Sequence, residues 1–178
     1  MATKGWSPTA IEGVMRRTAI PIGDERGAFT ELWRASLTRE LASEPFVQAN
    51  MSRSRAGVLR GMHFHIRQAD LWMLLEGRAL AATTDVRAAM GTSSGKVRSQ
   101  VAELTPGDSL YIPRLVAHGF WAIEDTVLLY LVSNEYDGTD EHGFAWNDPS
   151  AAIEWPDTQP ILSERDRANP TLDALARP

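Results

Sequence analysis

The chain has 178 residues, with 18 lysines and arginines against 23 aspartates and glutamates, and it contains no cysteine. Its length predicts one domain over residues 1–178 with a sizeable core, and the lack of cysteine excludes a disulfide scaffold, a thiol nucleophile and a thiolate metal site. The net charge of −5, with dispersed arginines, argues against nucleic acid as the main partner but leaves small anionic ligands open.

Residues 1–8 lack the charged and then apolar pattern of a signal peptide. No apolar run approaches the roughly 18 residues that are needed to cross a bilayer. We therefore expect a cytoplasmic protein that does not act at a membrane.

Short apolar or alternating runs recur between turn residues and predict β-strands. In chain order they lie at 18–21, 27–33, 46–52, 58–64, 71–75, 79–86, 97–104, 109–112 and 126–132. Helices are expected at 36–43 and from Ser163, where Ser163-Glu164-Arg165-Asp166 is typical of a helix start. The polar segment 88–96 predicts a loop within the same domain. Strands at this spacing favour an all-β sandwich or barrel with a few short helices.

The chain has four histidines, of which His63 and His65 lie two positions apart in a predicted strand. Strand alternation places both side chains on one face of the sheet. Their spacing resembles the two sequence signatures of the cupin superfamily, carried here by Gly57, His63, His65, Asp70 and Gly77 and by Gly107, Pro113 and His118. In cupins, two histidines, an acidic residue and a distant histidine converge on a metal inside a small β-barrel. The acidic residue is usually glutamate, whereas this chain has the shorter Asp70.

This resemblance implies a metal site formed by His63, His65, Asp70 and His118. Three imidazoles and one carboxylate suit Zn, Fe, Ni, Mn or Cu, and they leave coordination positions open for a substrate. The alternative is that the histidines are hydrogen-bonded residues that fill the barrel, with Asp70 in solvent at the start of a strand.

A second set of motifs covers most of the chain, at 24–31, 48–52, 57–64, 111–113, 117–120, 141, 146–149, 153–156 and 162–166. Together these segments resemble the dTDP-4-dehydrorhamnose 3,5-epimerase family over about residues 18 to 172. The resemblance implies a cupin jelly roll, a homodimer and a nucleotide-linked sugar as the small-molecule substrate.

The family's reaction removes a proton beside a ketone and returns a proton to the opposite face of the sugar. It needs a base, a group that stabilises the enolate and an acid on the other side. By resemblance, His63 is the base, Asp166 orients its imidazole and Tyr130 is the opposing acid. The residues that the resemblance implies for substrate binding are Arg26, Phe29, Glu31, Gln48, Asn50, Arg60, His118 and Glu141.

The chain departs from the family after Phe64. The family has a glutamine, a proline-bearing loop, and then a glutamine and a lysine; this chain has His65, no proline, and Gln68 followed by Asp70. The resemblance gives that lysine a share in stabilising the enolate oxygen, which the charge of Asp70 would repel. A bound metal could act there as a Lewis acid, but a histidine that ligates the metal cannot also accept the substrate proton.

Three functions therefore stay open. The first is an epimerase of a 4-keto-6-deoxy nucleotide sugar that acts through His63, Asp166 and Tyr130 without a cofactor. The second is an isomerase, lyase or oxygenase on the same scaffold that depends on a divalent transition metal. The third is a sugar-binding module without catalysis. The retained ligand-binding positions favour the first function, whereas His65 and Asp70 favour the second.

Overall fold

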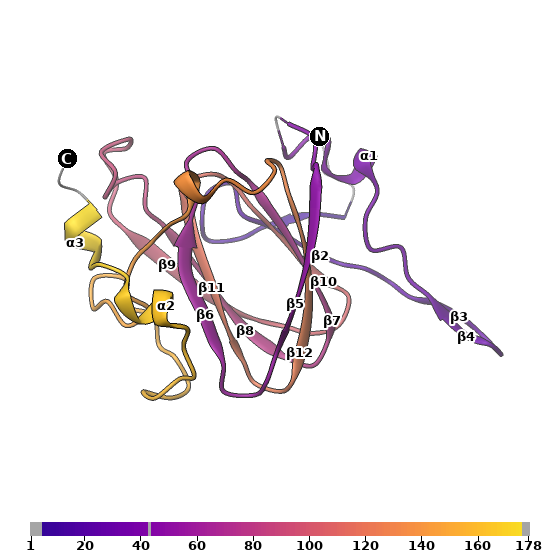
Figure 1. The fold of residues 1–178 in the computed structure, drawn as a ribbon. Helices are drawn as coiled ribbons and strands as arrows, with labels where there is room; N and C mark the ends of the chain where they lie inside the picture. Colours follow the sequence, from indigo (N-terminus) through magenta and orange to yellow (C-terminus); the bar gives the residue numbers. More distant parts are fainter. Residues whose placement is uncertain (1–4, 43, 176–178) are drawn as a thin grey trace.

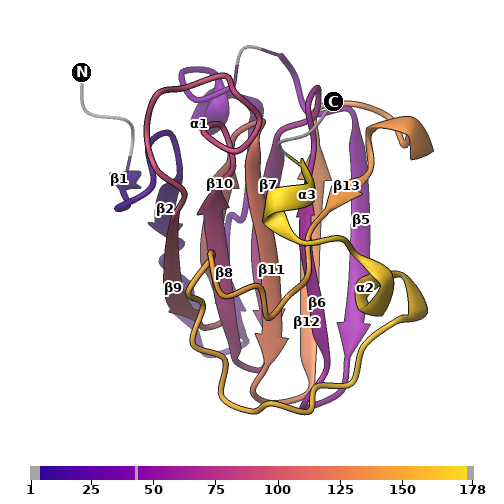
Figure 2. The ribbon, with the colours of Figure 1, turned by 90° about the vertical axis from the view of Figure 1, so that its left-hand side faces the viewer.

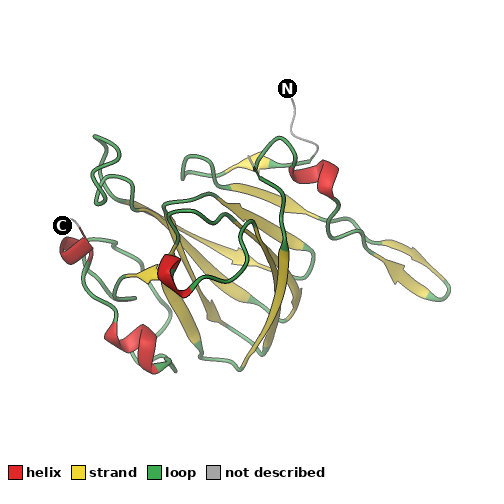
Figure 3. Cartoon of the chain, turned by 45° about the horizontal axis from the view of Figure 1, so that its top comes forward, coloured by secondary structure: helices red, strands yellow, loops and turns green. Residues whose placement is uncertain are grey.

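Two antiparallel sheets face each other in the computed structural model, which describes residues 5–42 and 44–175 (Figure 1). The six-stranded sheet has the order β1 (Ser7–Pro8), β2 (Met15–Thr18), β10 (Asp108–Ile112), β7 (Asp70–Glu76), β12 (Thr126–Val132) and β5 (Gln48–Ser54). The five-stranded sheet has the order β13 (His142–Gly143), β6 (Leu59–Phe64), β11 (Val116–Ala122), β8 (Ala79–Asp85) and β9 (Arg98–Leu104). This arrangement confirms the predicted jelly roll, and Figure 3 shows how little of the chain is helical.

Most of the predicted strands coincide with observed ones, but several regions differ, and the two-residue strands β1 and β13 were not predicted. The run at 18–21 is shifted, because β2 ends at Thr18. The run at 27–33 contributes only β4 (Gly27–Phe29), which pairs with the unpredicted β3 (Ile22–Asp24). Strand β11 was missed, and all seven of its residues are buried. A strand that is covered on both faces has no polar alternation, so the pattern used to find strands is absent from it.

Strands β3 and β4 form a separate two-stranded hairpin. Every residue of both strands is exposed. Figure 1 shows the hairpin extending away from the two sheets. Its apolar side chains Ile22 and Phe29 are therefore not buried by the chain to which they belong.

The helices are short. Helix α1 covers Ala35–Thr38, so the expected helix at 36–43 ends early, and position 43 lies outside the described residues. Helix α2 (Glu164–Ala168) begins as predicted, because the Ser163 hydroxyl accepts a hydrogen bond from the Asp166 backbone N–H. Helix α3 (Leu172–Leu175) and the 3-10 turn η1 (Gly138–Asp140) complete the set. The segment 88–96 is a loop between β8 and β9, as expected.

Alternation along the strands divides the apolar side chains between the inside and the outside of the sandwich. Trp72, Leu74 and Leu128 belong to the cluster between the sheets, whereas Leu71 and Met73 face outward toward Trp6. On the other sheet, Phe64 faces outward and packs with residues of the C-terminal segment, which crosses this face in Figure 2. Several inward positions that are not apolar line the site described below.

Among residues 5–42 and 44–175, no helix has the length and hydropathy that a membrane span requires.

Candidate active site

A cavity of about 290 Å³ lies among side chains from both sheets. Many of the predicted site residues line it, namely Gln48, Asn50, Arg60, His63, His65, Asp70, His118, Tyr130, Glu141 and Asp166. Strand register explains why they meet: His63 on β6 pairs with His118 on β11, and Tyr130 on β12 pairs with Asn50 on β5. Inward-facing positions on neighbouring strands thus bring together residues that are far apart in the sequence.

His63 is held by a carboxylate from the C-terminal segment. Its Nε2 lies 2.5 Å from Oδ1 of Asp166, a residue 103 positions further along the chain. Asp166 is 4% exposed. Burial raises the pKa of its carboxyl, but hydrogen bonds from His63 and Ser163 outweigh burial and lower the pKa overall. The carboxylate accepts the Nε2 proton, which leaves the lone pair on Nδ1 of His63 available as a base.

Tyr130 reaches the cavity from the sheet opposite His63. Burial raises the pKa of its phenol, and the negative charges of Asp70 and Glu141 raise it further. The phenol is therefore protonated at neutral pH and able to donate a proton or a hydrogen bond.

Three buried residues form a second group in the cavity: His65, Asp70 and His118, which each offer one ligand atom within 4.8 Å of the others. His63 does not belong to this group, so the expected set of four metal ligands is reduced to three. Its Nε2 is taken by Asp166 instead. Asp70 is only 3% exposed, so the expectation that it lies in solvent at the start of a strand is wrong.

Burial lowers the pKa of His118 to about 4, and nearby His65 and His63 lower it as well, although Asp70 acts in the opposite direction. The imidazole of His118 is therefore neutral at pH 7. It lies edge-on to Trp72, with ring centroids 5.2 Å apart.

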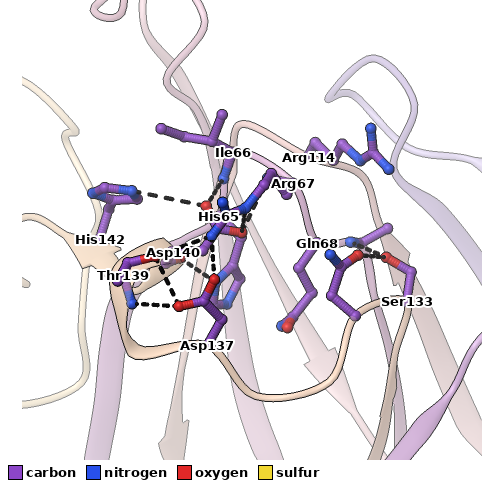
Figure 4. A network of polar contacts seen from close by, with 12 residues as sticks. His65, Ile66, Arg67, Gln68, Arg114, Ser133, Asp137, Thr139, Asp140 and His142 are labelled. Carbon is purple, nitrogen blue, oxygen red and sulfur yellow. Dashed lines mark hydrogen bonds and ion pairs between the residues drawn. The ribbon is translucent and has the colours of Figure 1, made fainter.

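The turn around η1 fixes His65, as Figure 4 shows. The Asp140 carbonyl accepts a hydrogen bond from Nδ1 of His65 at 2.7 Å, and the Asp140 carboxylate accepts the backbone N–H groups of Ile66 and Arg67. Arg67 also pairs with Asp137 across the turn. This support was not predicted from the sequence, although Asp137, which caps η1 by accepting from the Thr139 backbone N–H, is a recognisable turn residue.

Arg26, Phe29 and Glu31 do not line this cavity. Arg26 and Phe29 lie on or beside the exposed hairpin, where Arg26 pairs with Asp24. Glu31 follows the hairpin and lies 3.5 Å from Arg34. These three residues are therefore remote from the cavity of their own chain.

Several cavity residues were not among the predicted site residues. Gln68, Trp72, Phe120, Tyr136 and Arg165 also line the cavity. Arg165 forms an ion pair with Glu141, which joins helix α2 to the segment after η1. The position of Arg165 beside Asp166 was the available signal, since the two residues belong to the same helix start.

Comparisons with known proteins agree with this architecture. Residues 8–174 match the family model described as dTDP-4-dehydrorhamnose 3,5-epimerase. A relative from Streptomyces griseus named dTDP-4-dehydrorhamnose 3,5-epimerase is 37% identical over 177 residues, which cover 96% of this chain and 88% of the relative.

Two solved structures are similar over most of their length. NovW, a 4-keto-6-deoxy sugar epimerase from Streptomyces spheroides, has a TM-score of 0.84 and 33% identity, covering 95% of this chain and 87% of NovW. RmlC from Legionella pneumophila, solved in complex with dTDP-4-keto-L-rhamnose, has a TM-score of 0.84 and 31% identity, covering 94% and 92%. The chain belongs to the dTDP-4-dehydrorhamnose 3,5-epimerase family.

Proposed function

We propose that this protein epimerises a 4-keto-6-deoxy sugar linked to dTDP. The observation that carries the proposal is the placement of the His63–Asp166 pair and Tyr130 on opposing sheets around one cavity. A base and an acid that approach from opposite sides are what inversion at a carbon beside a ketone requires. The compound bound in the Legionella pneumophila structure, dTDP-4-keto-L-rhamnose, supports the sugar class.

In the proposed reaction, Nδ1 of His63 takes a proton from the carbon next to the ketone. The electron pair of the broken C–H bond moves onto the ketone oxygen and gives an enolate. Asp166, which accepts from Nε2, stabilises the imidazolium that forms. Tyr130 then donates its proton to the opposite face of the same carbon, and the enolate returns to a ketone. The reaction has no net oxidation, so it consumes no redox cofactor.

The nucleotide-linked part of the substrate is proposed to lie along β5 and β6. Gln48, Asn50 and Arg60 line that part of the cavity. Arg60 donates to the Ser54 hydroxyl through Nε at 2.9 Å, which holds its guanidinium in place. A guanidinium and amides together can bind phosphate and base groups.

We also propose a homodimer in which the β3–β4 hairpin of one chain completes the site of its partner. The first support is the exposure of the hairpin, where Phe29 is 68% and Ile22 72% exposed. The second is that the resemblance gives Arg26, Phe29 and Glu31 a part in substrate binding, which they cannot take at a cavity that they do not line. Apolar side chains on an extended hairpin gain stability when a second chain covers them.

Solvent-exchange measurements test the proposed reaction directly. The protein is incubated in deuterium oxide with dTDP-4-keto-L-rhamnose, and deuterium at the carbons beside the ketone is measured by mass spectrometry and NMR. Enzyme-dependent incorporation supports the proposal. Saturable binding of the same compound without incorporation would make the protein a sugar-nucleotide-binding module and would overturn it.

A further inference from the structure

We propose that His65, Asp70 and His118 bind a divalent transition-metal ion inside the cavity, at a site separate from the base His63. The three residues come from both sheets: His65 follows β6, His118 lies on β11, and Asp70 begins β7. They are 8%, 3% and 5% exposed, in the order His65, Asp70 and His118.

Hydrogen bonds to the backbone fix both imidazoles in the same tautomer. Nδ1 of His65 lies 2.7 Å from the Asp140 carbonyl, and Nδ1 of His118 lies 3.1 Å from the Val116 carbonyl. A carbonyl oxygen can only accept, so each Nδ1 carries the proton and each Nε2 keeps its lone pair. A histidine that ligates a metal typically donates its other ring N–H to a carbonyl or carboxylate in this way.

Asp70 is oriented in a similar manner. Gln68 donates its side-chain amide to Oδ1 of Asp70 at 2.8 Å, while Oδ2 faces Nε2 of His118 at 3.5 Å. That separation is too long for a hydrogen bond between the two groups. A carboxylate oxygen and a nitrogen lone pair therefore face each other in a buried place, an arrangement that a cation between them stabilises.

The ligand set determines the class of ion. Two imidazole nitrogens and one carboxylate oxygen suit Fe²⁺, Zn²⁺, Co²⁺, Ni²⁺ or Mn²⁺, whereas Mg²⁺ and Ca²⁺ prefer sites made of oxygen. Ligand atoms that each lie about 2.1 Å from a metal ion are about 3 to 3.5 Å from one another. The ligand atoms of His65, Asp70 and His118 lie within 4.8 Å of one another, so they would move closer by about an ångström when the ion binds. Three protein ligands leave coordination positions open toward the cavity.

The role of the ion rests on the proposed function. An epimerase needs a positive group near the ketone oxygen while the enolate exists, and the charge of Asp70 by itself is unfavourable there. Bound by Asp70, the metal would supply that positive charge as a Lewis acid. His63 stays free for proton transfer, because its imidazole is held by Asp166 and does not join the three ligands.

Metal binding is measured first, without reference to activity. Protein made without a metal-affinity tag is stripped with chelator, dialysed, and titrated with Zn²⁺ by calorimetry and with Co²⁺ by visible absorption, with Mg²⁺ as the comparison ion. We expect about one Zn²⁺ or Co²⁺ per chain, and ligand-field bands for the Co²⁺ protein. Asp70→Asn and His65→Gln should each weaken binding by at least about 100-fold.

Two further variants separate the two groups in the cavity. His142→Asn removes the histidine outside both groups, whose ring stacks on Phe64, and it should bind metal as the wild type does. His63→Asn should also bind metal normally but lose deuterium exchange. Circular dichroism and the metal-induced rise in melting temperature show that each variant is folded. The proposal is overturned if the folded wild type binds no Zn²⁺ or Co²⁺ at millimolar concentration, or if Asp70→Asn binds them equally well.

Deuterium exchange then tests the role. Removing the metal should slow exchange by at least about 10-fold, and Zn²⁺, Fe²⁺ or Co²⁺ should restore it. Unchanged exchange in the stripped protein overturns the Lewis-acid role and leaves the epimerase standing. If the protein binds one metal ion per chain but neither the loaded nor the stripped form exchanges deuterium into the sugar, the proposed epimerase activity is overturned and the metal site stands.

Discussion

The cavity and the β3–β4 hairpin carry residues from the same family motifs, but the chain positions them very differently. In the cavity, His118 is 5% exposed and Asp166 4%, and both have defined hydrogen-bond partners. On the hairpin, Phe29 is 68% exposed and the charges of Arg26 and Asp24 satisfy each other. Sheet register and burial therefore bring the cavity residues together within one chain. The hairpin residues, in contrast, do not line a cavity of the chain that carries them.

A similar contrast separates two histidines inside the cavity. His63 and His65 have the same strand parity, yet His63 meets Asp166 and His65 meets the Asp140 carbonyl. The first contact joins a basic group to a carboxylate and favours proton transfer, while the second orients an imidazole through its Nδ1 and favours metal binding. Motif spacing predicts a shared face but does not distinguish these surroundings.

The largest expected effect concerns the cavity. His63→Asn removes the proposed base and should slow deuterium exchange by about 10²- to 10⁴-fold. Binding of dTDP should change little, because the substitution alters only the end of the cavity that is proposed to hold the sugar. Exchange is followed by mass spectrometry, with His142→Asn as the matched histidine control. A His63→Asn rate within a factor of a few of the wild type would remove His63 from the reaction.

Core and hairpin should also differ in stability. Phe144 is fully buried against the five-stranded sheet, so Phe144→Ala should lower the free energy of unfolding by about 3 to 5 kcal/mol. Ile22→Ala on the hairpin should cost less than about 0.5 kcal/mol in the dissociated chain. Urea unfolding over a range of protein concentrations measures both. An Ile22→Ala effect that does not depend on concentration would mean that the hairpin packs on its own chain.

Mixing two defective proteins tests whether the hairpin acts on a partner. Arg26→Ala should weaken substrate binding by about 10- to 100-fold, with an unchanged melting temperature. When it is refolded together with His63→Asn, some dimers gain one site with an intact His63 and an intact hairpin, so activity at low substrate should recover. No recovery from a mixture that forms mixed dimers by native mass spectrometry would assign the hairpin to its own chain.

The smallest effect is a pH-dependent one. Burial raises the pKa of Asp108, but hydrogen bonds from Thr18, Thr105 and Arg16 outweigh it and lower the pKa below its ordinary value of 3.8. A lowered pKa means that the carboxylate stabilises the fold above pH 3.8, and that this contribution is lost as the pH falls through the lowered pKa. Asp108→Asn should cost about 1 to 2 kcal/mol at pH 7.

Urea unfolding between neutral pH and the acid limit of folding measures the difference between this variant and the wild type. The difference should shrink only at the acid end. Asp24→Asn on the hairpin is the control. The pKa of Asp24 is also lowered, by its bonds to Arg26, but the pair is exposed, and no measurable loss of stability should follow at any pH.

The sequence by itself determined the fold class, the loop at 88–96 and the start of helix α2. These features depend on local patterns: alternation along strands, turn residues and a capping serine. Motif resemblance also identified about half of the residues that line the cavity. Strand β11 could not be predicted in this way, because burial on both faces removes the alternation.

Only the tertiary structure decided which partner each site residue has. It joined His63 to a carboxylate 103 positions away, left His65, Asp70 and His118 as a separate group, and kept the hairpin outside the cavity. The physical reason is that alternation sets the direction of a side chain, whereas its hydrogen-bond partner depends on which distant segment crosses the barrel at that point.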